Sequence, residues 1–370
     1  MPEIIRSAER ASFKRCRRAW DLGSRSRQNY EPVVPAQAFD FERAIHDALA
    51  LYYFPGMWEW DRSLVRRLTL EGFVKSMRKQ LAAYAAVAEV SEAQDDDWQS
   101  QLGAGVRLLE RYFEWAPAVD AFSPVRVETD FDANVPDPTA AGHDLVAPGG
   151  GPIHYQGRID ALVVDAYDAY WIVDHRIVEG GWESLSQLLL DEQGVAACWA
   201  WEIFYYGMRI AGTIYNEIRL DAPDADAGIV GPGTRAAVPD TPGALAGKRR
   251  MYMQALRVPE ERVEVSEAGA FRRTRITRSR AELAACGRQV AQEALEMTSA
   301  GLVVYPNPSV AHCVPCAYRE PCIALNMGVD PTAILAERYR DRGPEEVEEG
   351  RLGGVSWSMN RGARPPAFGG

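Results

Sequence analysis

The feature that most constrains this chain is a pair of apolar runs, each beside an acid. Residues 161–164 and 170–173 are rich in the β-branched and aromatic side chains that favour strands, and residues 166–168 can turn between them. A hairpin across that turn brings Asp160 opposite Asp174. Facing residues of an antiparallel pair have Cβ atoms about 4.5–5.5 Å apart, and facing carboxylates repel each other. The sequence therefore predicts a cation between these two acids.

An arginine stands two residues after the second acid. Side chains alternate along a strand, so Asp174 and Arg176 are expected to point to the same face. Mg²⁺ takes oxygen ligands and keeps several waters, which suits two carboxylates and a substrate phosphate. The pattern indicates phosphodiester cleavage. The alternative, for either acid taken alone, is an ordinary strand end facing solvent.

The order of these residues resembles a known family. Gly157-Arg-Ile-Asp160, a strand break and Ile172-Val-Asp174-His-Arg176 resemble the motifs of the PD-(D/E)xK nuclease superfamily, and specifically its RecB-like branch, which includes CRISPR-associated exonucleases and related phage nucleases. The resemblance implies an α/β, restriction-endonuclease-like fold: a mixed sheet flanked by helices, with a helical insertion. It also implies that Arg176 contacts the scissile phosphate. The family has Lys at that position, and the exchange is not conservative because Arg is a planar fork that stays charged.

The resemblance implies further residues near the metal. His46 lies in a segment with a helical pattern, and the family carries a helical histidine near the metal, where a neutral imidazole can bind an ion or orient a carboxylate. Glu128 lies in an alternating, strand-like segment and corresponds to the family's upstream acid. Asp130 shares its face and is the competitor. The resemblance implies that His46, Asp160 and Asp174 hold Mg²⁺ or Mn²⁺, with Glu128 assisting.

A glutamine follows on a predicted helix. The apolar pattern predicts one long helix over residues 182–208, with Gln193 pointing toward the core side. The family has a Gln followed four residues later by Tyr, and these side chains position water or DNA. Gln193 fits this pattern, but Ala197 stands at the aromatic position. The aromatic role passes to Trp199 or Trp201, or is absent.

Four of the six cysteines form a metal-ligand pattern. Cys313, Cys316 and Cys322 are spaced so that three thiolates can meet one metal, and Cys16 near the start of the chain would supply the fourth. The resemblance implies a 4Fe-4S cluster on these four thiolates. This cluster would join the N- and C-terminal regions as a structural staple. Zinc is the alternative occupant, bound either by the four thiolates or by three of them with His312.

Composition restricts the setting of this activity. A net charge of −11 argues against indiscriminate nucleic-acid binding, although basic clusters within residues 14–27 and 272–280 could form a local groove or simply solvated helix faces. No apolar run reaches the roughly 18 residues of a membrane span, and no signal core begins the chain. We therefore expect a cytoplasmic protein without a membrane partner.

The same patterns predict the domain organisation. We expect an N-terminal segment with the first cluster cysteine over residues 1–35, a helical lobe over 36–120, a nuclease core over 121–220, an irregular loop over 221–265, a C-terminal helix with the cysteine motif over 266–328 and a flexible tail over 329–370.

Three functions compete. The first is a metal-dependent DNA nuclease, expected to act as an exonuclease on DNA ends or single strands in DNA repair or phage replication, with a helicase or recombination protein as a further partner. The second is a catalytically impaired, nuclease-fold subunit that binds DNA or acts as a scaffold, which Arg176 and Ala197 favour. The third is a zinc-ribbon interaction protein. Retention of both acids and of Gln193 favours the nuclease.

Overall fold

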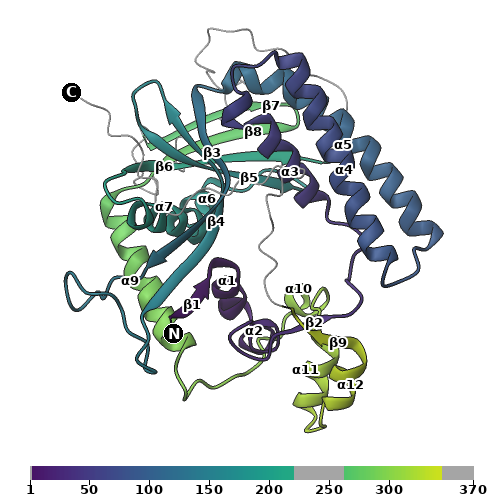
Figure 1. The fold of residues 1–370 in the computed structure, drawn as a ribbon, viewed down its shortest axis with the longest axis vertical. Helices are drawn as coiled ribbons and strands as arrows, with labels where there is room; N and C mark the ends of the chain where they lie inside the picture. Colours follow the sequence, from purple (N-terminus) through teal and green to yellow (C-terminus); the bar gives the residue numbers. More distant parts are fainter. Residues whose placement is uncertain (1, 221–261, 344–370) are drawn as a thin grey trace, which may run out of the picture.

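The computed structural model describes residues 2–220 and 262–343, which form a mixed sheet covered by helices on both faces (Figure 1). In these residues the main sheet has seven strands in the order β1-β4-β5-β6-β8-β7, with β3 also paired to β4. The strands are β1 (Glu3–Arg6), β3 (Phe122–Asn134), β4 (Ile153–Asp165), β5 (Tyr170–Val178), β6 (Ile210–Arg219), β7 (Val263–Ala268) and β8 (Phe271–Thr277). The predicted mixed sheet flanked by helices is confirmed.

Strands β4 and β5 form the predicted hairpin. Their pairs run from Val164 opposite Tyr170 to Ala161 opposite Val173. Asp168 in the turn has φ +59°, in the left-handed region that aspartate tolerates better than most residues. The β4–β5 ladder ends at the pair of Ala161 and Val173, one residue before Asp160 and Asp174, the two acids that the hairpin was expected to bring together.

The chain crosses from β5 to the parallel strand β6 through two helices, α6 (Leu185–Leu189) and α7 (Glu192–Phe204). The single long helix predicted for this segment is wrong. The Asp191 side chain accepts hydrogen bonds from the backbone N–H groups of Gln193 and Gly194, at 3.3 and 3.0 Å. A side chain that bonds the nearby backbone in this way favours a helix start over a helix interior, so a new helix begins here.

Alternation along β5 divides its side chains between two cores. Ile172 packs on one face of the sheet, whereas Trp171 and Val173 pack on the other. The first face is covered by α1 (Ser7–Arg15), α7 and α9 (Arg280–Met297), and the second by α3 (Phe41–Tyr52), α4 (Arg62–Ala85) and α5 (Glu92–Val119). Because both faces are covered, the central strands are apolar along most of their length.

The remaining short elements are α2 (Arg17–Gly23), β2 (Tyr30–Pro32), η1 (Pro55–Met57), α10 (Val310–Cys313), α11 (Arg319–Asn326), α12 (Thr332–Arg338) and β9 (Tyr339–Asp341). Strands β2 and β9 pair antiparallel and join the N-terminal segment to the C-terminal one. A flexible tail was expected from residue 329, but residues 332–341 form α12 and β9; residues 344–370 lie outside the described residues.

The expected irregular loop over residues 221–265 also lies mostly outside the described residues, and strand β7 already begins at Val263. Across residues 2–220 and 262–343, no helix combines the length and apolarity that crossing a membrane requires.

Candidate active site

Strand β4 has a gap in its pairing. One of its edges pairs with β3 along most of its length, and the other pairs with β1 over residues 153–156 and with β5 over residues 161–164. Among the described strands, residues 157–160 have no partner on that second edge. Asp160 lies at the end of this gap, where its Oδ2 accepts a hydrogen bond from the backbone N–H of His175 at 2.7 Å.

Asp160 and Asp174 border the same small cavity, of about 40 Å³. Burial raises the pKa of Asp174 to about 7; Arg176 opposes this rise and the charge of Asp160 adds to it. The structure therefore brings the two predicted acids together at one cavity. The cavity is lined by Ser7, Phe131, Tyr155, Arg158, Ile159, Asp160, Ile172, Val173, Asp174, Gln193, Gly194 and Ala197.

A histidine and two acids gather on the α3 side of the gap. Nδ1 of His46 lies 3.5 Å from Oδ1 of Asp160 and 4.0 Å from Oε1 of Glu128. One ligand atom from each of the three residues lies within 4.8 Å of the other two. Burial by itself lowers the pKa of His46, but its hydrogen bond to Asp160 and the nearby carboxylates raise it to about 9. In the metal-free protein, a proton on this imidazole partly neutralises the acids.

These three side chains fit a divalent cation. Carboxylate oxygens suit Mg²⁺ and Mn²⁺, whereas an imidazole nitrogen is more often a ligand of transition metals. The nitrogen of His46 and the oxygens of Glu128 and Asp160 are therefore a donor set that suits Mn²⁺ well and also provides two oxygens for Mg²⁺.

Glu128 occupies this place at a cost in backbone energy. Its φ is +42°, in the left-handed region. The β3–β4 pairing is regular on either side, with Val127 opposite Ala161 and Thr129 opposite Ile159. A non-glycine residue in that region costs roughly 1–2 kcal/mol. Strain of this kind tends to occur at functional sites.

Asp130, the competitor of Glu128, is placed elsewhere. It is exposed and pairs with Arg158, with 2.6 Å between its Oδ1 and the arginine Nε. The structure thus brings Glu128 beside Asp160 and leaves Asp130 on the surface.

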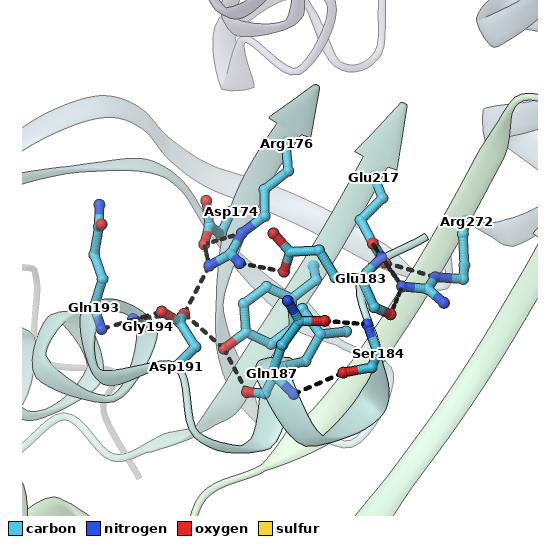
Figure 2. Close-up of polar contacts among 12 residues, drawn as sticks. Asp174, Arg176, Glu183, Ser184, Gln187, Asp191, Gln193, Gly194, Glu217 and Arg272 are labelled. Carbon is cyan, nitrogen blue, oxygen red and sulfur yellow. Dashed lines mark hydrogen bonds and ion pairs between the residues drawn. The ribbon is translucent and has the colours of Figure 1, made fainter. Parts of the chain in front are cut away.

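Arg176 is surrounded by carboxylates (Figure 2). Its Nη2 donates to Oδ2 of Asp174 and to Oδ2 of Asp191, both at 2.7 Å, and its Nη1 donates to Oε2 of Glu183 at 2.6 Å. Its guanidinium lies over the ring of Tyr215, 4.6 Å from the centroid. The pKa of Arg176 is raised because these carboxylates outweigh the effect of burial.

Asp191 and Glu183 were not predicted as site residues. Asp191 stands directly before the apolar helix α7, and an N-cap pattern of this kind was the available signal. Glu183 carried no signal, because it lies in an irregular segment. Its backbone N–H donates to Glu217, which is buried and paired with Arg272 (Figure 2).

Behind the gap, polar side chains form a row across three strands. His175, Asn216 and Arg273 occupy neighbouring register positions on β5, β6 and β8. Nη2 of Arg273 donates to Oδ1 of Asn216 at 3.0 Å, and Nδ2 of Asn216 lies 2.8 Å from Nδ1 of His175. Burial lowers the pKa of His175 to about 3, so its imidazole is neutral. Asn216 therefore donates to Nδ1, and the proton of His175 is on Nε2.

The row ends at the helical layer that covers this face. Arg273 forms a buried ion pair with Asp120, and its Nη2 also lies 3.1 and 3.0 Å from the hydroxyls of Tyr53 and Tyr112. The ring of His175 packs edge to face against His46, with 5.9 Å between centroids. The buried row thus supports His46 from behind.

Gln193 is exposed at the edge of the cavity, and the predicted core-facing orientation is wrong, because helix α7 begins only at Glu192. Ala197 also lines the cavity. Trp199 and Trp201 are buried in the core, so neither takes the aromatic position.

The basic cluster over residues 272–280, for which a local groove and solvated helix faces were both considered, lies along β8 and at the start of α9. Its arginines are paired with acids of the protein itself. The pairs are Arg272 with Glu217, Arg273 with Asp120, Arg275 with Asp165, Arg278 with Glu282 and Arg280 with Glu202.

The four cysteines of the predicted cluster lie at the junction of α1 and α2 and in the C-terminal segment that contains α10 and α11. Burial raises the pKa of the Cys322 thiol, and the sulfurs of Cys16, Cys316 and Cys313 add to the rise. All four are free thiols. The backbone N–H of Asn307 lies 3.4 Å from Sγ of Cys16. Among the described residues, the one metal-ligand group with donor atoms within 4.8 Å of one another is His46, Glu128 and Asp160, and it contains no cysteine.

Comparison with known proteins identifies the family. The family model of the PD-(D/E)XK nuclease superfamily matches residues 8–323. A search of curated proteins returned no match. The mixed sheet with flanking helices is consistent with the restriction-endonuclease-like fold that the resemblance implied. This chain belongs to the PD-(D/E)XK nuclease superfamily.

Proposed function

We propose that the protein is a divalent-metal-dependent deoxyribonuclease that hydrolyses phosphodiester bonds. The observation that carries this proposal is the grouping of His46, Glu128 and Asp160 within 4.8 Å, beside the cavity that Asp174 shares. The membership of the chain in a nuclease superfamily supports the same conclusion.

Each residue has a proposed task. His46, Glu128 and Asp160 would hold the cation, with Asp174 as the second acid across the cavity. When bound, a divalent cation polarises the phosphoryl group and lowers the pKa of a bound water. Arg176 keeps positive charge beside Asp174, and the exposed amide of Gln193 can hydrogen-bond substrate or water at the edge of the cavity.

The test is cleavage of end-labelled DNA by the purified protein. We expect cleavage with Mn²⁺ or Mg²⁺, its loss with EDTA and its return when Mn²⁺ is added in excess. A protein that cuts equally well in EDTA would contradict the proposal. Exonuclease action follows from the resemblance to the RecB-like branch, and it predicts that linear single strands are degraded while circular ones survive. A helicase or recombination partner stays a prediction from the same resemblance.

Binding of Mn²⁺ should depend on pH. His46 must lose its proton to act as a ligand, and its pKa in the metal-free protein is raised from 6.5 to about 9. Binding therefore releases a proton in this range, and the affinity should rise by up to about tenfold per pH unit as pH increases from 6.5 towards 9. Anaerobic calorimetry in buffers of different ionisation enthalpy measures both the affinity and the proton release.

The matched control for the pH dependence is His46→Gln, which removes the titrating ligand. We expect weaker Mn²⁺ binding and a shallower pH dependence between neutral pH and about 9 in this variant. The same slope in both proteins would rule out His46 as the ligand that releases the proton.

One observation favours a second candidate, the catalytically impaired DNA-binding or scaffolding subunit. The guanidinium of Arg176 is already engaged by three carboxylates. If this pairing keeps the guanidinium of Arg176 from contacting the scissile phosphate, the protein should bind DNA without cutting it. Arg176→Lys should then confer cutting. We prefer the nuclease because the metal-binding group is complete without Arg176.

We further propose that Cys16, Cys313, Cys316 and Cys322 hold a 4Fe-4S cluster. The influence of Cys16, Cys316 and Cys313 on the pKa of the Cys322 thiol supports this proposal, as does the N–H of Asn307 directed at Cys16, because hydrogen bonds to sulfur are part of such sites. Binding a cluster would add to the stability of the fold, since its ligands come from α1–α2 and from the C-terminal region.

Anaerobically purified protein should contain iron and sulfide in equal amounts and absorb broadly in the visible range. Cys322→Ser should lose this absorption and lower the melting temperature, whereas Cys286→Ala, at a buried cysteine outside the group, should keep the absorption. Stoichiometric zinc without sulfide would contradict the cluster and support the zinc alternative.

A further inference from the structure

Arg176 is fixed in place by three segments of the chain (Figure 2). Asp174 lies on the same strand, Glu183 in the segment before α6, and Asp191 at the start of α7. Nε of Arg176 also donates to Oδ2 of Asp174, at 3.0 Å, so this carboxylate receives two of the hydrogen bonds. With Tyr215 beneath the guanidinium, the side chain is held in both position and plane.

Asp191 connects the guanidinium of Arg176 to helix α7. Its Oδ2 receives hydrogen bonds from Arg176 at 2.7 Å, from Gly194 N–H at 3.0 Å and from the hydroxyl of Tyr215 at 2.9 Å. Its Oδ1 accepts from Gln193 N–H at 3.3 Å. The same carboxylate therefore caps the helix and orients the arginine.

The first turn of α7 borders the cavity. Gln193 and Gly194 both line it, as do Asp160 and Asp174. A shift of Asp191 would move the arginine and this turn together. The position of the Arg176 guanidinium beside Asp174 thus depends on Asp191, which does not itself line the cavity.

We propose that Asp191 is a positioning residue for the cleavage reaction. It holds the guanidinium of Arg176 against Asp174 and fixes the turn that carries Gln193. The proposal rests on the proposed nuclease function and adds a reason for arginine at this position. The planar fork of Arg can meet three carboxylates in fixed directions, whereas the single ammonium of Lys is a point charge and cannot bridge them in the same way.

Capping and orientation can be separated by substitution. Serine caps a helix about as well as aspartate, so helix α7 should still form in Asp191→Ser. The short serine side chain should lose the hydrogen bond to Arg176. Asp61→Ser is the matched control, because Asp61 caps α4 through the N–H groups of Ser63 and Leu64, at 2.9 and 3.3 Å. Asp191→Asn is the conservative variant, since asparagine caps equally well and retains one oxygen that Arg176 can reach.

The experiment measures kcat and KM for DNA, Mn²⁺ affinity and melting temperature of the full-length protein. We expect Asp191→Ser to lower kcat by roughly 10–100-fold, as loss of a supporting residue typically does. KM, Mn²⁺ affinity and melting temperature should stay close to those of Asp61→Ser. Asp191→Asn should recover part of the lost kcat, which a purely structural role of the cap would not explain.

Each other outcome overturns the proposal. A normal kcat in Asp191→Ser would show that the arginine needs no support from this residue. Loss of Mn²⁺ binding in Asp191→Ser would make Asp191 a metal ligand instead. An equal loss of kcat in Asp61→Ser would mean that helix capping in general is responsible. Absence of cleavage by the wild-type protein would remove the proposed function itself, a result that differs from all of these.

Discussion

Asp160→Asn is expected to abolish DNA cleavage while the protein stays folded. The substitution keeps the size of the side chain and an oxygen that can accept the N–H of His175, but it removes the charge that faces His46. Catalysis by a bound metal is worth several kcal/mol, and about 1.4 kcal/mol corresponds to tenfold in rate. We therefore expect kcat to fall on the order of 10³-fold, measured on end-labelled DNA with saturating Mn²⁺.

The control for this prediction is Asp132→Asn. Asp132 lies on the neighbouring strand β3, where it contacts His154 and Gln156 at the surface, and it does not line the cavity. The DNA-cleavage activity of Asp132→Asn should stay close to that of the wild type. If Asp160→Asn retained cleavage within about tenfold, the carboxylate would contribute less than about 1.4 kcal/mol and could not be a metal ligand of the reaction.

Arg273→Met is expected to give the largest loss of stability. The guanidinium is the partner of Asp120, and both side chains are about 4% exposed. Burial raises the pKa of Asp120, and Arg273 is the main opposing influence. Removing one member of a buried ion pair leaves an uncompensated charge and typically costs about 3–5 kcal/mol. Urea unfolding should show a lower midpoint with an unchanged m-value.

Arg338→Met provides the comparison, because Arg338 and Glu320 form an ion pair with both side chains largely exposed. Exposed pairs contribute about 0–1 kcal/mol. In addition, Asp120→Asn combined with Arg273→Met should recover part of the lost stability, since the buried charge is then absent. A cost below about 1 kcal/mol for Arg273→Met alone would mean that water reaches Asp120 or that the pair is not buried in solution.

The sequence was sufficient for features that depend on local patterns. The hairpin followed from two apolar runs and a short turn, and its register placed Asp160 and Asp174 at one cavity. The alternation along β3 placed Glu128 on a candidate face, although alternation alone could not separate it from Asp130. That choice required the structure, in which Glu128 has an unusual φ and its Oε1 lies 4.0 Å from Nδ1 of His46.

Features that apolar periodicity does not report, most of them contacts between residues distant in sequence, were not predicted. The apolar stripes of α6 and α7 read as one helix, because periodicity does not reveal that Asp191 caps the second. The arginines of residues 272–280 looked like a phosphate-binding patch until strand pairing showed their acidic neighbours. The ion pairs of Arg176 with Glu183 and Asp191 form because the crossover from β5 to β6 brings these two acids together.

The most direct test of the proposed metal site is an anomalous-difference map from crystals grown with Mn²⁺. We predict a peak within bonding distance of His46, Glu128 and Asp160, in the gap between β1 and β5 along strand β4. A peak held instead by Glu183 and Asp191, or no peak at this gap in a protein that cleaves DNA with Mn²⁺, would contradict the account.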